Sequence, residues 1–134
     1  MAATPLDSLA QYIAVDLAIG ALGTVVFEDS MPDQPDTCIA IYNSGGAAPA
    51  LTSGDDTDYP SFQLRSRAAD ADVARTNLIT IYQALHAVTE TDIHGTHFKV
   101  IGYKQSNPVP LGKDEKQRFE FTQNLFAFVR GVTR

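Results

Sequence analysis

Apolar residues recur at helical spacing near the start of the chain. Spacings of three and four place four of them on one stripe of a helix: Leu6, Leu9, Ile13 and Leu17. Thr4 precedes Pro5 here, and this pair is typical of a helix start because threonine caps the first turn and proline suits its first position. We expect the helix to end at Gly20 or Gly23, since glycine is favoured just past a helix terminus.

A second helical pattern begins at Asp70 and Asp72, where carboxylates favour the free N–H groups of a first turn. Five apolar residues then follow at helical spacing: Ala74, Leu78, Ile81, Leu85 and Val88. This stretch is long enough to cover a sheet with its apolar stripe.

The remaining apolar segments have the patterns of strands. They are Thr24–Phe27, Thr37–Tyr42, Ser61–Arg67, Thr96–Gln105 and Arg118–Arg130. The segment from Cys38 to Tyr42 is apolar without alternation, which predicts a central strand buried on both faces. In the last segment the apolar residues change from odd to even positions, which predicts a bulge or a change of cover near Asn124–Leu125.

Three polar stretches connect these segments. Glu28–Asp36 contains two prolines and four acids and is expected to turn, and Ser106–Lys116 is a connection rich in proline, glycine and charge. Asn43–Pro60 contains mainly Gly, Ala, Pro, Ser and Asp, and we expect one long loop there. Long loops in compact domains are usually functional or disordered.

The order of helices and strands predicts an α+β fold. We expect an antiparallel or mixed sheet of about five strands with two helices packed on one face. The 134 residues are expected to form a single domain, residues 1–134, because this length suits one hydrophobic core.

Charge is distributed unevenly along the chain. Residues 1–64 contain nine acids and no Lys or Arg, whereas the rest contains all ten basic residues and seven acids, for a net charge of −6. An acidic chain is poorly suited to grip nucleic acid, which requires Lys and Arg to replace counterions. The start lacks the positive region of a secretory signal and no apolar run could cross a bilayer, so we expect a cytoplasmic protein without membrane contact.

Reactive residue types are few, and none forms a recognisable constellation. Cys38 lies in an apolar strand and is expected to be a buried structural thiol. His94 and His97 could contact one metal, but no third ligand is evident. Three acids of the long loop lack the spacing of a calcium loop: Asp55, Asp56 and Asp58. We therefore expect no metal, no cofactor and no enzymatic activity.

Four segments carry a resemblance to a known family. They are the apolar strand and glycine turn of Asp36–Gly46, the strand Tyr59–Arg67, the connection Gln105–Glu115 and the closing strand Arg118–Leu125. In these segments the stretch from Pro35 to Gly131 resembles the tail terminator and minor capsid proteins of long-tailed bacteriophages, and the helix at Leu6–Ile19 adds to the match.

The resemblance implies a structural virion protein without catalytic residues. Such proteins form a ring, commonly of six subunits, on the head-proximal end of the tail tube. The ring stops tube polymerisation and presents a surface to the head–tail connector, and DNA later passes through its lumen without specific binding. The resemblance therefore implies a place at the head–tail junction of a virion that is assembled in the cytoplasm of a bacterial host.

The uneven charge adds two hypotheses about contacts. A ring needs two different patches on each subunit, and an acidic patch of the first half could meet a basic patch on the neighbour. The candidates for the basic patch are Arg65, Arg67 and Arg118. The candidates for an acidic surface that faces either the lumen or the tube are Asp55, Asp56 and Asp58.

Two other functions stay open at the level of sequence. A head-completion or stopper protein of the viral neck would have a similar small α+β fold. A small-molecule or host-factor binding module would need an apolar pocket, although the phenylalanines are accounted for by strands and core. A hydrolase is least favoured because no nucleophile–base pair is visible.

Overall fold

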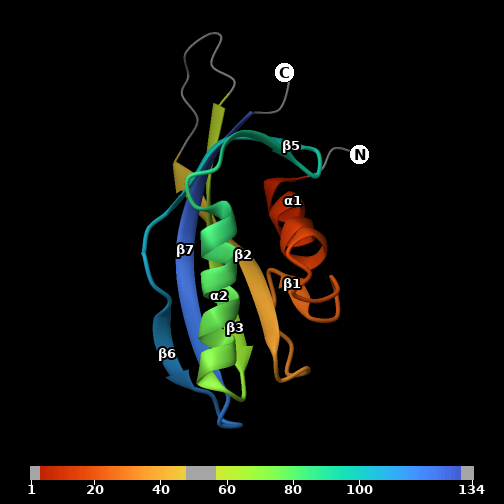
Figure 1. The fold of residues 1–134 in the computed structure, drawn as a ribbon, viewed down its shortest axis with the longest axis vertical. Coiled ribbons are helices and arrows are strands. Elements are labelled where there is room, and N and C mark those ends of the chain that lie inside the picture. The colour runs from red at the N-terminus through yellow and green to blue at the C-terminus, as the bar shows by residue number, and fades with distance from the viewer. Residues whose placement is uncertain (1–3, 48–56, 131–134) are drawn as a thin grey trace.

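A mixed sheet with both helices on one face makes up the fold (Figure 1). The computed structural model describes residues 4–47 and 57–130. Its elements are α1 (Pro5–Gln11), a π-helical turn (Tyr12–Asp16), β1 (Val26–Glu28), β2 (Cys38–Ala47), β3 (Thr57–Ala68), α2 (Ala71–Leu85), β4 (Thr89–Ile93), β5 (Thr96–Tyr103), β6 (Val109–Lys113) and β7 (Phe119–Arg130).

The strand order is β1-β2-β3-β7-β5-β4, and β6 pairs with β7 beyond the end of β5. β1 lies parallel to β2, and every other pairing is antiparallel. The predicted α+β class, mixed sheet and one-sided helices are confirmed. The sheet has seven strands instead of about five, because two short strands have no clear apolar pattern.

The first helix is shorter than its apolar stripe suggests. Thr4 caps it as predicted, with its hydroxyl accepting a hydrogen bond from the backbone N–H of Asp7 at 3.1 Å. The helix then widens into the π-helical turn and ends at Asp16, so the predicted end at Gly20 or Gly23 was wrong. The backbone at Ala18 has φ of 54°, which stops the helix before either glycine.

α2 follows its sequence pattern closely. The carboxylate of Asp70 caps its first turn by accepting from the N–H of Asp72 at 2.8 Å. Four of the five predicted stripe residues are buried: Ala74, Leu78, Ile81 and Leu85. Val88 lies beyond the helix end and is only partly buried against the core.

The predicted loop Asn43–Pro60 was wrong at both ends. β2 continues through Ala47 and β3 begins at Thr57, so the two strands form an antiparallel arm. A register shift between Asn43 and Gly46 marks a bulge, and Gly46 has φ of 118°. Glycine in a bulge disrupts the apolar alternation by which strands are predicted, which is why this part of the arm was interpreted as a loop.

β4 and β6 were not predicted as strands. β4 has exposed, polar side chains, and a two-residue turn at His94 and Gly95, both with positive φ, joins it to β5. β6 contains Pro110 and lies inside the predicted connection Ser106–Lys116. Polarity in one strand and proline in the other hid both segments from a search for alternating apolar residues.

β7 runs without a bulge through the middle of the sheet. Its register with β3 is constant from Thr57↔Arg130 to Ala68↔Phe119, so the bulge expected near Asn124–Leu125 was wrong. The residues that face the helices and the core keep odd numbers throughout, whereas Phe126 and Phe128 lie on the opposite face. There the Phe126 ring crosses Gly102, where an added Cβ would lie 2.5 Å from it.

The hydrophobic core lies between the sheet and the two helices. Its large, fully buried side chains include Leu9, Ile41, Phe62, Leu78 and Leu125, which come from both helices and the central strands. None of the helices among residues 4–47 and 57–130 combines the length and apolar character needed to cross a membrane.

The outermost strands of the described sheet, β1, β4 and β6, are poorly suited to pairing with another strand, although β1 covers β2 only at Ile39–Ile41. β1 has three residues, β4 carries Glu90 and Asp92, and β6 contains Pro110 and a register shift between Pro110 and Gly112. Short length, charge, proline and bulges are the devices that prevent strand addition. Association with other proteins is therefore expected to use faces and side chains of this fold.

Candidate functional site

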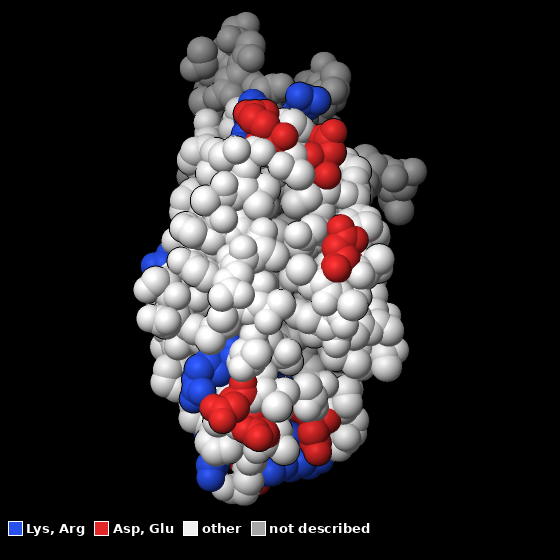
Figure 2. All heavy atoms as spheres, viewed as in Figure 1, with Lys and Arg blue, Asp and Glu red and all other residues white. Residues whose placement is uncertain are grey.

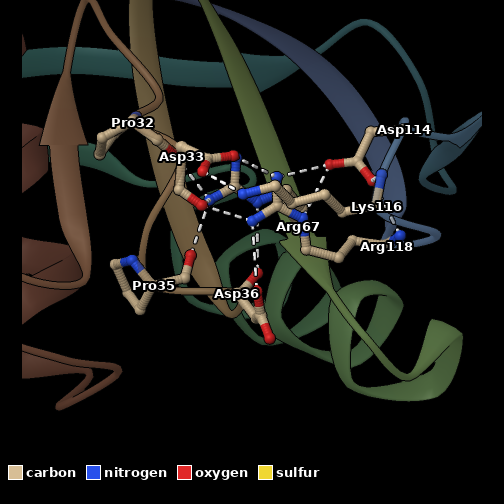
Figure 3. Close-up of polar contacts among 8 residues, drawn as sticks. All are labelled: Pro32, Asp33, Pro35, Asp36, Arg67, Asp114, Lys116 and Arg118. Carbon is tan, nitrogen blue, oxygen red and sulfur yellow. Dashed lines mark hydrogen bonds and ion pairs between the residues drawn. The ribbon is translucent and has the colours of Figure 1, made fainter.

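Two predicted arginines meet at one end of the sheet and bind the loop between β1 and β2 (Figure 3). Arg67 projects from β3 on the face that the helices leave open, and its exposed fraction is 4%. Its guanidinium donates to four backbone carbonyls: Pro32 at 2.7 Å, Asp33 at 3.3 Å, Pro35 at 2.6 Å and Asp36 at 3.3 Å. Among the described residues these carbonyls have no hydrogen-bond donor from a sheet or a helix, so the arginine takes the place of the water that would otherwise bind them.

Arg118 holds the same loop through carboxylates. Its side chain donates to Asp114 at 2.8 Å, to Asp33 at 3.1 Å and to Asp36 at 3.2 Å. Lys116 forms a further ion pair with Asp33. We call the set of Asp33, Asp36, Arg67, Asp114, Lys116 and Arg118 the arginine cluster.

The arginine cluster lowers the pKa of the carboxyl groups of Asp33 and Asp114. The pKa of Asp33 lies below its usual value because Lys116 and Arg118 donate to it. The pKa of Asp114 is lowered mainly by the backbone N–H of Arg118, and Asp114 in turn raises the pKa of that guanidinium. Acidic residues of the first half thus pair with basic residues of the second half inside one chain.

Arg65 lies two residues before Arg67 on the same open face and is half-buried. It stands opposite Ala40 in β2 and Thr122 in β7, near the middle of the sheet. Its buried Nε has no hydrogen-bond partner. Burial raises the pKa of neighbouring Tyr42, and the positive charge of Arg65 opposes that rise. Of the three predicted arginines, Arg65 has an unused donor.

The predicted acidic residues lie apart from the arginine cluster. Asp58 is half-buried in β3 opposite Val129, and Asp55 and Asp56 lie outside the described residues. Sequence reasoning missed the role of Asp33, Asp36 and Asp114. The signal was present, because the Pro-rich turn concentrates acids that have no basic neighbour in the first half of the chain.

Cys38 is fully buried, as predicted, and burial raises the pKa of its thiol. A buried thiol of raised pKa is a poor nucleophile. His97 lies between Glu90 at 2.8 Å and Asp92 at 2.7 Å, and these two carboxylates raise its pKa. His94 instead contacts Asp16 at 3.1 Å. Within the residues that the structure describes, no three His, Cys, Asp or Glu side chains are arranged to hold a metal.

A carboxyl pair that the sequence did not reveal lies between α1 and β1. The side chains of Asp7 and Glu28 share a hydrogen bond, which lowers the pKa of Asp7 and raises that of Glu28 from 4.5 to about 7. Partial burial and the charges of Asp7 and Asp29 raise the pKa of Glu28 further. We call Asp7, Glu28 and Asp29 the acidic corner.

We predict that thermal stability falls as the pH rises from about 4.5 to about 7, because over this range the folded chain holds the Glu28 proton and the unfolded chain does not. A pKa that folding raises contributes stability that is complete below the unfolded value, here 4.5, and lost as the pH passes about 7. Glu28→Gln imitates the protonated form and should reduce the pH dependence of the melting temperature by a few degrees.

The matched control for this prediction is His97→Gln. The pKa of His97 is raised as well, so its contribution is also lost as the pH rises, but independently of Glu28. The melting temperature of His97→Gln should therefore still show the decrease with rising pH that Glu28 causes. An unchanged pH profile of Glu28→Gln would contradict the prediction.

The comparison with known families decides the identity of this fold. The family model described as bacteriophage tail terminator protein matches residues 15–127. The chain belongs to the bacteriophage tail terminator protein family. Its role is thus a structural one in the phage tail, and the resemblance expected from the sequence is confirmed. The match includes the arginine cluster, Arg65 and most of the sheet.

A solved structure supports the fold of this family member. A chain in the structure titled "Virion of native gene transfer agent (GTA) particle" is similar with a TM-score of 0.61 and 15% sequence identity. The similarity covers 89% of this chain and 84% of that one. No curated protein matches the sequence. The arginine cluster stabilises a loop of the terminator fold and contains no catalytic arrangement.

Proposed function

We propose that this chain forms a ring of six copies on the head-proximal end of the tail tube. The ring ends tube polymerisation and offers the surface that joins the tail to the head–tail connector. The family match over residues 15–127 carries this proposal. The similarity to a chain of a gene transfer agent virion supports a place within a virion.

The physical properties of the fold support a ring that acts by shape. The edge strands β1, β4 and β6 are short, charged or interrupted by proline, which opposes strand addition. Copies therefore join through side-chain contacts, and the same contact repeated around an axis closes a ring. The net charge of −6 disfavours retention of DNA, which lets DNA slide through the lumen without specific binding. The partners are the tail tube protein, the connector and further copies of this chain.

The experiment that tests the proposal is tube assembly with the cognate tube protein. We expect tubes of limited length, with a ring at one end, when this chain is present, and longer tubes when it is absent. Negative-stain images and tube-length distributions measure both. Unchanged tube length, or density on the portal side only, would contradict the proposal, and the second result would favour a stopper protein.

Arg65 is the predicted arginine that we propose for contact with the tail tube protein. Its side chain is half-exposed on the open face, whereas Arg67 and Arg118 are committed to the arginine cluster. We propose the acidic residues Asp55, Asp56 and Asp58 for the surface that faces the lumen or the tube.

We predict that Arg65→Glu weakens tube capping at least about tenfold while rings still form, because the reversed charge repels an acidic partner. The measurement is the concentration of this chain that halves the mean tube length. Lys104→Glu is the matched control, since Lys104 is exposed and lies on the short link after β5. Equal capping by both variants would remove Arg65 from the contact surface.

A further inference from the structure

A groove lies between the first turns of α2 and strand β6, at the lower left of the view in Figure 1. Its volume is about 400 Å³. Phe119 and Phe121 of β7 line it, together with Ala71 and Arg75 on the helix side and Pro108 and Pro110 on the β6 side. The groove is thus an apolar channel with walls from two separate elements.

Two cations lie over the aromatic rings of the groove. The Arg75 guanidinium lies 5.3 Å from the ring centre of Phe121, and the Lys113 ammonium lies 4.8 Å from that of Phe119. Arg75 also pairs with exposed Asp72, whereas Lys113 has no carboxylate partner within residues 4–47 and 57–130. Glu120 also lines the groove and Asp72 pairs with Arg75, so two carboxylates balance the two cations, and Lys113 beside the groove is the cation without a carboxylate partner in the described residues.

The two elements that border this groove also carry exposed apolar side chains. The structure has six exposed large hydrophobic residues within its described part, and three of them belong to α2 and β6. These are Val73, Val109 and Leu111, with exposed fractions of 42%, 41% and 45%. Exposed apolar side chains on the elements beside an aromatic groove are typical of a protein contact surface.

The opposite side of the molecule has the complementary character. α1 and β1 carry the acidic corner and lie at the right of Figure 1, away from β6. The acidic corner has no Lys or Arg partner within the described residues, and the elements around it expose Val15 (66%) and Leu22 (42%). Figure 2, in the same view as Figure 1, shows a broad, largely uncharged area across the middle of the face that carries the helices.

The arrangement suits a head-to-tail contact. A ring requires two different, complementary patches on opposite sides of each subunit. The groove supplies Lys113, Arg75 and an aromatic lining on one side, and the acidic corner supplies carboxylates and apolar neighbours on the other. Among the described residues Lys113 has no carboxylate partner and the acidic corner has no Lys or Arg partner, so the two can pair across a subunit boundary.

We propose that the groove of one copy receives the acidic corner of a second copy, so that Arg75 and Lys113 bind Glu28 and Asp29 across the subunit boundary. This inference rests on the proposed ring. The basic residues of this contact are Arg75 and Lys113, which the sequence did not indicate. Arg67 and Arg118 are not available for it, because their donors are occupied in the arginine cluster.

The first test is cross-linking of the unmodified protein. A carbodiimide joins an amine to a carboxylate without a spacer, so it links Lys113 only to a carboxylate in contact with it. We mix isotopically light and heavy copies, with and without tube protein, and expect mixed-isotope links from Lys113 to Glu28 or Asp29. Links to tube protein alone, or no link of Lys113 between copies, would overturn the inference.

The second test reverses the charges. Arg75→Glu with Lys113→Glu, and separately Glu28→Lys with Asp29→Lys, should each weaken self-association at least about tenfold, because like charges then face each other. The variant with all four changes should recover association. Lys104→Glu is the control, melting curves verify folding, and sedimentation velocity measures the assembly.

The outcomes separate this inference from the ring proposal. Rings that form equally in the wild type and the groove variant overturn the groove contact and leave the ring intact. A wild-type chain that forms no ring and leaves tube length unchanged overturns the proposed function, while the cross-links decide the groove contact independently. Binding of a DNA duplex that requires Arg75 and Lys113, with self-association unaffected, also overturns the inference.

Discussion

Replacing Arg67 with alanine should lower the free energy of unfolding by about 3 kcal/mol, because a buried charged donor and its acceptors lose their hydrogen bonds together. The guanidinium of Arg67 donates to the carbonyls of Pro32, Asp33, Pro35 and Asp36. Without it, these part-buried carbonyls lose the donor that holds their loop against β3. Urea unfolding followed by circular dichroism measures the loss.

Two further variants make the Arg67 prediction specific. Arg67→Lys should recover little, because an ammonium is a point charge and cannot reproduce the planar fork that reaches four carbonyls. Lys104→Ala, an exposed basic residue without such contacts, should change stability by less than about 0.5 kcal/mol. Equal losses in Arg67→Ala and Lys104→Ala would contradict a structural role for the arginine cluster.

Phe62→Ala should have a still larger effect, a loss of about 3–5 kcal/mol. The ring of Phe62 is fully buried at the middle of β3, opposite Leu125 of the central strand β7. Its removal loses apolar burial and leaves a cavity. β3 cannot move to fill this cavity because it is paired with a strand on each side. The free energy of unfolding of a small domain is only about 5–15 kcal/mol, so a fraction of the variant molecules should be unfolded at body temperature.

Phe128→Ala is the matched control for Phe62→Ala. Phe128 lies on the open face of β7, is 38% exposed and contacts Tyr59 edge to face at 5.1 Å. Phe128 also contacts the Phe126 ring at 5.8 Å, and the loss of these two partly exposed aromatic pairs should cost about 1–2 kcal/mol. Thermal melts of the two variants should therefore differ clearly, and equal melting temperatures would contradict the assignment of the core to the helix-covered face.

Local patterns predicted the parts of the fold in which one face meets the core. α2 was predicted with its N-terminal cap and most of its stripe because buried and exposed residues alternate at the helical period. β4 was missed because its exposed polar residues carry no such contrast. The arm of β2 and β3 was interpreted as a loop because glycine and proline interrupt the apolar alternation there. These strands are held by their pairing with each other, which a local pattern does not show.

The candidate site was predictable only in its residue types. The sequence drew attention to Arg67 and Arg118 through the uneven charge of the two halves. It could not show that these halves pair within one chain, because that depends on which loop β3 and β7 bring together. The groove was missed for the same reason, since Arg75 and Lys113 come from elements far apart in the sequence.

The position of β7 has a consequence for how this chain matures. β7 is the last strand in the sequence, yet it lies between β3 and β5 and also pairs with β6. While the ribosome still holds β7, β3 and β5 lack their shared neighbour and Arg118 is not yet in place. Folding of the sheet is therefore postponed until β7 has left the ribosome, and a product truncated before Phe119 lacks the strand that joins β3 to β5.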